Sequence, residues 1–223
     1  MKGVILAAGI GSRLGRKLPK CLTQINNDET IIGRQIRLLK ENGINEIIAV
    51  VGFKKELIME FYPEILYKYN PLYSVTNTSK SLLEGIKDLY DDVIWLNGDT
   101  VFDGNIIKLL ISHQGNAVAV NTSRCAEEEV KYKTDKNGFI TEISKKVKEA
   151  EGEAVGINKI TKEDIDEFKQ ALLKCNADDY FERAIEIMIN GGKKFKAIDI
   201  GENRCIEIDF KEDLSNAIDL FKK

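Results

Sequence analysis

The chain has 223 residues, of which 43% are hydrophobic and 31% are charged, and this composition is typical of a soluble globular protein. Its net charge of −3 at pH 7 argues against the strongly basic surface that nucleic-acid binding needs, and it contains no apolar run near the ~18 residues of a membrane span. We therefore expect one cytoplasmic domain over residues 1–223, with no nucleic-acid partner and no membrane association.

The first half of the chain alternates apolar, β-branched runs with amphipathic segments. This pattern predicts strands over 2–7, 46–52, 65–69 and 93–96, and helices over 29–42, 54–61 and 78–89. The alternation favours an α/β fold of the Rossmann-like, doubly wound class, in which helices cover both faces of a mainly parallel sheet. Ligands of such folds bind beyond the carboxyl ends of the strands, so the segments after residues 7 and 96 are the first candidates for a site.

The second half of the chain is less regular. Asn137-Gly138 separates two β-rich runs, 130–134 and 139–144, and this arrangement predicts a β-hairpin. The remaining pattern predicts strands over 117–121, 154–160, 195–200 and 205–209, and helices over 161–174, 178–190 and 211–222. We expect a mixed sheet in which the hairpin is a small lid or extension of the same domain.

The first strand runs directly into a glycine loop that is followed by two cations. Gly9 and Gly11 can take positive φ and let backbone amides approach an anion closely. Arg13 suits bidentate contact with phosphate oxygens, and Lys20 supplies a mobile point charge. The loop is not a dinucleotide fingerprint, which would need a third glycine at Leu14, and it is not a P-loop, whose lysine follows a glycine. It predicts a triphosphate-binding loop.

The motif Leu-Ala-Ala-Gly-x-Gly-x-Arg-Leu with a downstream Pro-Lys resembles the nucleotidyltransferases of the sugar-phosphate and choline-phosphate cytidylyltransferase type, which have the MobA-like NTP transferase fold. The resemblance implies that Arg13 and Lys20 grip the triphosphate and stabilise the transition state, while the backbone of the loop holds the base and phosphates. The residues that we expect around the nucleotide are Leu6, Ala7, Ala8, Gly9, Gly11, Ser12, Asn77, Ser81 and Gly98.

Two carboxylates stand at predicted strand ends. Asp99 follows Gly98 after an apolar strand, and Asp209 ends the run Cys205-Ile206-Glu207-Ile208-Asp209. Two carboxylates together with phosphate oxygens suit Mg²⁺, which would neutralise charge developing at the α-phosphate. Each aspartate could instead cap the helix that follows it. The resemblance favours metal binding, because the family pairs an Asp in a Gly-Asp step with a later Ile-Asp or Val-Asp.

Residues 70–82 form a polar segment ahead of a predicted helix. Helix capping would explain one or two of its Ser, Thr and Asn side chains, and neutral donors and acceptors also suit a base edge or a ribose. The segment resembles the Thr-Asn-x-x-x-Ser-Leu segment of choline-phosphate and phosphonate cytidylyltransferases. That resemblance places Asn77 and Ser81 near the base.

A lysine cluster ends the second strand of the predicted hairpin. Lys145 could face the phosphate of the acceptor and help to bring two anions together, with Lys146 or Lys148 as alternatives and a solvated basic loop as the simpler interpretation. Glu151 and Glu153 lie close by in the sequence. They could attract a positively charged acceptor such as phosphocholine, or they could simply solubilise the loop.

The leading hypothesis is a Mg²⁺-dependent enzyme that transfers CMP from CTP, or a nucleotidyl group from another NTP, to a phosphocholine-like acceptor with release of pyrophosphate. The nucleotide part would cover about 1–115 and the acceptor part about 116–205, with a homodimer as an allowed assembly. Only six residues, 14–19, separate Arg13 from Lys20, a spacing that resembles inositol-phosphate enzymes. A sugar-1-phosphate or inositol-phosphate nucleotidyltransferase is therefore the alternative, and a non-catalytic nucleotide-binding regulator is the alternative of another class.

Overall fold

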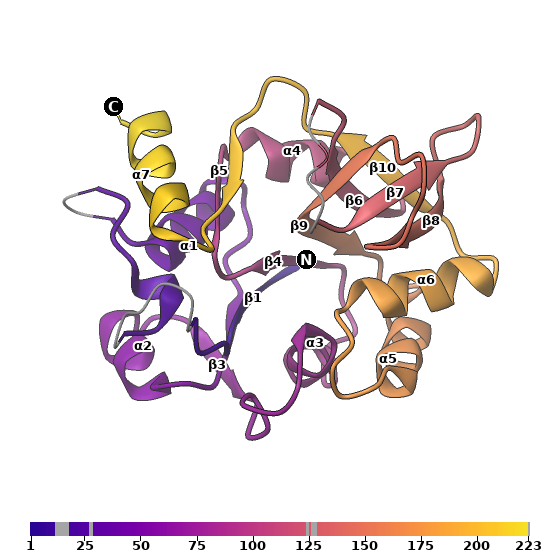
Figure 1. The fold of residues 1–223 in the computed structure, drawn as a ribbon. Helices are drawn as coiled ribbons and strands as arrows, with labels where there is room; N and C mark the ends of the chain where they lie inside the picture. The colour runs from indigo at the N-terminus through magenta and orange to yellow at the C-terminus, as the bar shows by residue number, and fades with distance from the viewer. Residues whose placement is uncertain (12–17, 27–28, 124, 126–128, 223) are drawn as a thin grey trace.

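The structure is a computed structural model that describes residues 1–11, 18–26, 29–123, 125 and 129–222. Within these residues nine strands form one mixed sheet (Figure 1). Seven of them follow the order β10-β6-β9-β4-β1-β2-β3, and β7 pairs with both β8 and β9. The strands of this sheet are β1 (Lys2–Ala7), β2 (Ile47–Val51), β3 (Leu66–Tyr69), β4 (Val93–Asn97), β6 (Asn116–Asn121), β7 (Lys131–Thr134), β8 (Ile140–Ser144), β9 (Gly152–Ile160) and β10 (Phe195–Asp199).

The sheet is mainly parallel, as predicted. β1 pairs in parallel with β2 and β4, β2 pairs in parallel with β3, and β10 pairs in parallel with β6. β9 lies antiparallel between β4 and β6, and its first residues extend the sheet to the β7–β8 hairpin. The predicted hairpin is thus confirmed, and it is joined to the central sheet through β9.

Helices cover both faces of the sheet, which confirms the doubly wound class. Side chains of α3, α5 and α6 share one hydrophobic core with the sheet, and those of α1, α2 and α4 share a second core. α7 packs on a third, smaller cluster with Ile25, Ile31 and Val101. The helices are α1 (Ile31–Glu41), α2 (Lys55–Phe61), α3 (Thr78–Ile86), α4 (Asn105–Ser112), α5 (Ile165–Lys174), α6 (Glu182–Asn190) and α7 (Lys211–Leu220). None of the helices in the described part of the chain has the length and apolar character needed to cross a bilayer.

A separate two-stranded ribbon was not predicted. β5 (Thr100–Phe102) pairs antiparallel with β11 (Cys205–Glu207), with Thr100 opposite Glu207. The predicted strand over 205–209 is therefore shorter and lies outside the main sheet. A three-residue strand is too short to show a periodicity, which explains why the run at 100–102 carried no strand signal.

Two predicted helices begin four residues later than expected. α5 starts at Ile165 and α6 starts at Glu182. The residues before α6 instead bond to the start of α3: Asn77 N donates to Ala177 O at 2.7 Å, and Phe181 N donates to Thr78 Oγ1 at 3.1 Å. These tertiary hydrogen bonds compete with helix formation, and residues 177–178 form a turn ahead of α6.

Candidate active site

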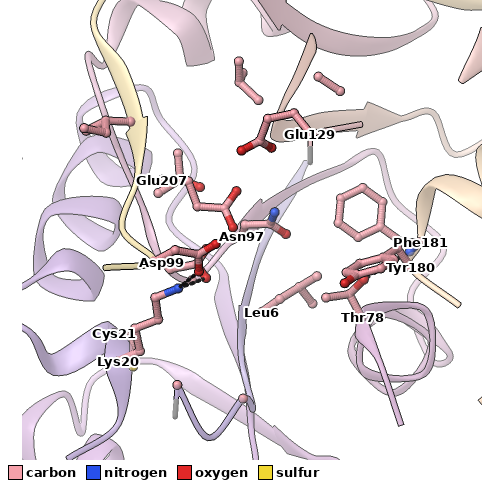
Figure 2. Close-up of a pocket in the computed structure, with 18 of the residues that line it drawn as sticks. Leu6, Lys20, Cys21, Thr78, Asn97, Asp99, Glu129, Tyr180, Phe181 and Glu207 are labelled. Carbon is pink, nitrogen blue, oxygen red and sulfur yellow. Dashed lines mark hydrogen bonds and ion pairs between the residues drawn. The ribbon is translucent and has the colours of Figure 1, made fainter. Parts of the chain in front are cut away.

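A cavity of about 620 Å³ lies beyond the carboxyl ends of β1 and β4. The parallel register places Leu6 beside Asn97, so the glycine loop after β1 and the Gly98-Asp99 step after β4 leave the sheet side by side. The cavity continues past the ribbon of β5 and β11 to the connection between α5 and α6 (Figure 2). Its volume falls in the range of small-molecule and cofactor sites.

The glycine loop lines this cavity, although only one of its glycines behaves as predicted. Gly11 has φ +63°, and a Cβ there would lie 2.8 Å from Cβ of Lys20, so glycine lets the lysine stem approach the loop. Gly9 does not adopt positive φ, which corrects the expectation for that residue. A Cβ at Gly9 would meet nothing within 4 Å, and the absence of a side chain leaves that space to a ligand.

The nucleotide residues predicted from the sequence do not all reach the cavity. Its lining includes Leu6, Ala7, Gly9, Gly11, Asn77 and Gly98. Ala8 is buried outside this lining, where its carbonyl accepts a hydrogen bond from Phe53 N. Ser81 is also buried, and its hydroxyl accepts a hydrogen bond from Asn70 Nδ2 at 3.0 Å. Ser12 and Arg13 lie outside the described residues.

Lys20 forms the centre of the charged end of the cavity. Its Nζ donates to Asp99 Oδ2 at 2.8 Å and to Asp209 Oδ1 at 2.6 Å (Figure 2). Burial alone would lower the pKa of this ammonium, but the two carboxylates outweigh burial and raise the pKa above its ordinary value. The lysine is therefore charged at neutral pH and is already oriented towards the residues that we expect to act with it.

A third carboxylate joins the two predicted ones. Single oxygens of Asp99, Glu207 and Asp209 lie within 4.8 Å of one another. Burial, and next the charge of Asp99, raise the pKa of Glu207 to about 9. Glu207 was missed by sequence reasoning, although the alternation of Cys205–Asp209 carried the signal, because residues two apart in an extended run share a face.

The positions of Asp99 and Asp209 follow from the ribbon and from α1. Ile208 N donates to Asp99 O at 3.0 Å, which holds the two segments together. Gln35 of α1 donates its Nε2 to the carbonyls of Asn97 and Thr100, both at 2.8 Å, and so fixes the turn that carries Asp99.

Neither aspartate serves as the helix cap that the simpler interpretation expected. Asp99 is followed by β5, and α4 has Gly104 at its N-cap position. At the start of α7 the Asp213 carboxylate accepts hydrogen bonds from Asp209 N at 3.0 Å and from Phe210 N at 2.7 Å. The Asp209 side chain is thereby left to Lys20 and the neighbouring carboxylates.

The step from β4 to Asp99 leaves no room for a side chain at Gly98. A Cβ there would lie 2.4 Å from Leu6 O, a backbone atom of β1 that also accepts a hydrogen bond from Gly98 N. We expect Gly98→Ala to push the two strand ends apart and to lower the free energy of unfolding by about 1–3 kcal/mol. Chemical denaturation would measure this loss. Gly43→Ala would not serve as a control, because Gly43 has positive φ and an alanine there would be strained. Gly9→Ala, whose Cβ meets nothing, should leave stability nearly unchanged.

The opposite end of the cavity is acidic and aromatic. Glu182 and Tyr180 line it together with Lys145, whose Nζ lies 4.7 Å from the centroid of the Tyr180 ring. Glu129 and Glu153 also line the cavity, and Glu129 is close enough to both Glu207 and Glu182 for its charge to add to burial in raising the pKa of each. Of the three candidate lysines, Lys145 is the one in this lining. Glu151 is not, and its carboxylate accepts hydrogen bonds from Thr134 N and Oγ1 at 2.9 and 2.8 Å.

Comparison with known proteins gives the same fold. A family model described as the MobA-like NTP transferase domain matches residues 3–167. A CTP:phosphoglutamine cytidylyltransferase from Campylobacter jejuni is 28% identical over 254 residues, which cover 98% of this chain and 100% of the relative. Two solved structures each give a TM-score of 0.80. A CTP:phosphocholine cytidylyltransferase from Streptococcus pneumoniae is 21% identical and covers 99% of both chains, and an inositol-1-phosphate CTP transferase from T. maritima is 18% identical and covers 100% of this chain and 97% of its own.

Proposed function

The chain belongs to the family of MobA-like NTP transferases, and on this premise we propose that it transfers CMP from CTP to a phosphorylated small molecule of the phosphocholine type. In this reaction an anionic oxygen of the acceptor phosphate attacks the α-phosphorus in line. The new P–O bond forms as the bond to the β-phosphate oxygen breaks, and pyrophosphate leaves. A protein nucleophile is not needed, because the acceptor itself carries the attacking oxygen.

The observation that carries this proposal is the arrangement of Lys20 with Asp99, Glu207 and Asp209 beside the glycine loop. A site that only binds a nucleotide would need no more than hydrogen-bond donors to the phosphates. Here an oriented cation, the carboxylates of Asp99 and Asp209 and the carboxyl group of Glu207, with oxygens within 4.8 Å of one another, lie at the end of β4, where ligands of open α/β sheets bind. Fixed charges around a reacting phosphate favour transfer, because they stabilise charge that moves during the reaction.

The same carboxylates fit Mg²⁺. They are hard oxygen donors, and Mg²⁺ in nucleotide sites commonly binds through one or two carboxylates and the substrate phosphates. A cation, the Lys20 ammonium, already lies between two of them at hydrogen-bond distance. The residues that would hold the metal are Asp99 and Asp209, with Glu207 beside them. When bound, Mg²⁺ would polarise the phosphoryl oxygens and neutralise their charge.

The charge of the acceptor end supports a cationic acceptor. Away from Lys20 the cavity lining contributes the acidic groups of Glu129, Glu153 and Glu182 and the ammonium of Lys145, so acidic groups outnumber ammonium groups there. A phosphorylated amine carries both signs of charge. Its phosphate would meet Lys145 and Lys20, and its cationic group would meet the glutamates. Transfer to inositol phosphate or a sugar 1-phosphate remains the alternative, because glutamates also accept hydrogen bonds from hydroxyl groups.

Pyrophosphate release tests the proposal directly. We expect CTP with phosphocholine or a related phosphorylated amine to exceed ATP, GTP and UTP, and to exceed inositol 1-phosphate and hexose 1-phosphates as acceptors. Higher rates with a sugar phosphate would transfer the assignment to the alternative enzyme. Binding of CTP in equilibrium dialysis without pyrophosphate release from any pair would favour a non-catalytic regulator.

A further inference from the structure

Glu182 is a buried carboxyl group at the acceptor end of the cavity that the transfer step itself does not use. It is the first residue of α6, only 7% of it is exposed, and it contributes to the cavity lining. Its Oε2 has no hydrogen-bond partner among the residues that the structure describes. Burial raises the pKa of this carboxyl to about 7. A buried polar atom without a hydrogen-bond partner is destabilising, so its presence in the cavity lining points to a ligand that supplies the missing hydrogen bond.

The described residues around Glu182 hold it in place, and none of them forms an ion pair with its carboxyl group. Phe181 N is bonded to Thr78 Oγ1 at 3.1 Å, so the start of α6 is tied to the start of α3. The next residue, Arg183, forms its ion pair with Glu186. The Lys145 ammonium is close enough to influence Glu182 electrostatically, but the contact that it makes is with the ring of Tyr180.

We propose that Glu182 selects acceptors whose cationic group carries an N–H, so that the preferred acceptor is a phosphorylated primary, secondary or tertiary amine and not a trimethylammonium compound. This inference rests on the proposed function and refines its acceptor. A protonated amine can donate a hydrogen bond to the buried carboxylate, whereas a quaternary ammonium has no N–H to donate.

The aromatic residues of the cavity support the same choice. Quaternary ammonium groups are recognised by free aromatic faces. Here the Lys145 ammonium lies over the Tyr180 ring at 4.7 Å from its centroid. Phe181 is 1% exposed and packs edge-on against Trp95, with ring centroids 5.7 Å apart. Tyr180 and Phe181 therefore do not form a cage of open rings at this end of the cavity, whereas Glu182 offers a buried hydrogen-bond acceptor.

The test is a methylation series with CTP as the donor. Phosphoethanolamine and its N-methyl, N,N-dimethyl and N,N,N-trimethyl forms keep one positive charge while the number of N–H groups falls from three to none. We expect kcat/KM to change modestly over the first three compounds and to fall by roughly 10- to 100-fold at phosphocholine, when the last donor is lost. Glu182→Leu should reduce the fall at phosphocholine to about 3-fold or less. The control variant Glu186→Gln should retain it, because Glu186 lies one turn further along α6, pairs with Arg183 and is not part of the cavity lining.

Thermal unfolding separates this role from a structural one. A ligand-binding carboxyl that is unpaired in the free protein should leave the melting temperature of Glu182→Leu and Glu182→Gln unchanged or raised. A melting temperature lowered in both variants would overturn the inference. So would a Glu182→Leu variant that keeps the full fall in kcat/KM at phosphocholine, or a wild-type protein that prefers phosphocholine. These results would leave CMP transfer standing. Pyrophosphate release with a sugar phosphate but with none of the four amines would overturn both the inference and the cationic acceptor.

Discussion

Lys20→Ala should lower kcat/KM for nucleotidyl transfer by a factor on the order of 10²–10³, the loss typical of removing one oriented donor from a transition state. The Lys20 ammonium is held by two carboxylates at 2.8 and 2.6 Å and is positioned by the close approach of its stem to Gly11. A triphosphate would offer it a second set of anionic oxygens. Because the charge on those oxygens changes during transfer, the lysine should affect turnover more than CTP binding.

Removal of the Lys20 charge should strengthen the binding of a divalent metal ion even though it slows the reaction. An ammonium between Asp99 and Asp209 competes with a divalent cation for the same oxygens, and the two positive charges repel each other. Lys20→Met, which keeps the stem and removes the charge, should therefore bind Mn²⁺ more tightly in the absence of nucleotide, as measured by electron paramagnetic resonance. Lys87→Met is a suitable control, because Lys87 pairs with Glu84 on the surface. Normal turnover in Lys20→Ala would refute the catalytic assignment, and unchanged Mn²⁺ affinity in Lys20→Met would refute the competition.

The parts of the site that could be predicted are those in which one short segment of sequence contains both the strand and the functional residues. The strand, the glycine loop and Lys20 are contiguous, and Gly98-Asp99 follows an apolar strand directly, so strand-end geometry was sufficient. The proximity of Asp209 to Asp99 was expected, but its cause was not. It arises from the β5–β11 ribbon and not from adjacent strands of the main sheet.

The acceptor end could not be read locally. Glu182 lines the cavity because Asn77 and Thr78 bind the connection between α5 and α6, which lies about a hundred residues further along the chain. No short sequence pattern encodes that contact. Ser81 illustrates the opposite error, since its spacing resembles a nucleotide segment while its hydroxyl lies buried against Asn70. Sequence resemblance preserves the position of such a residue but does not determine which way its side chain turns on the helix.

Asp99→Asn should abolish most nucleotidyl transfer while leaving the fold intact. The substitution keeps the shape of the side chain and removes the negative charge that Lys20 and the proposed metal share. The backbone role of the residue survives, because its carbonyl still accepts the hydrogen bond from Ile208 N. We expect kcat to fall by a factor on the order of 10²–10³ and the Mg²⁺ concentration for half-maximal rate to rise, since one hard anionic ligand becomes a neutral amide.

The matched control is Asp103→Asn, four residues along the chain. The Asp103 carboxylate pairs with Arg204 at 2.7 Å and is not part of the cavity lining, so its loss should change stability slightly and kcat very little. Equal losses of kcat in the two variants would mean that Asp99 acts through folding and not through the metal. An Asp99→Asn enzyme with an unchanged Mg²⁺ requirement would place the metal elsewhere. A selective loss in Asp99→Asn, accompanied by a higher Mg²⁺ requirement, would tie the Gly98-Asp99 step to the chemistry, because only a ligand of the reacting centre changes rate and metal dependence together.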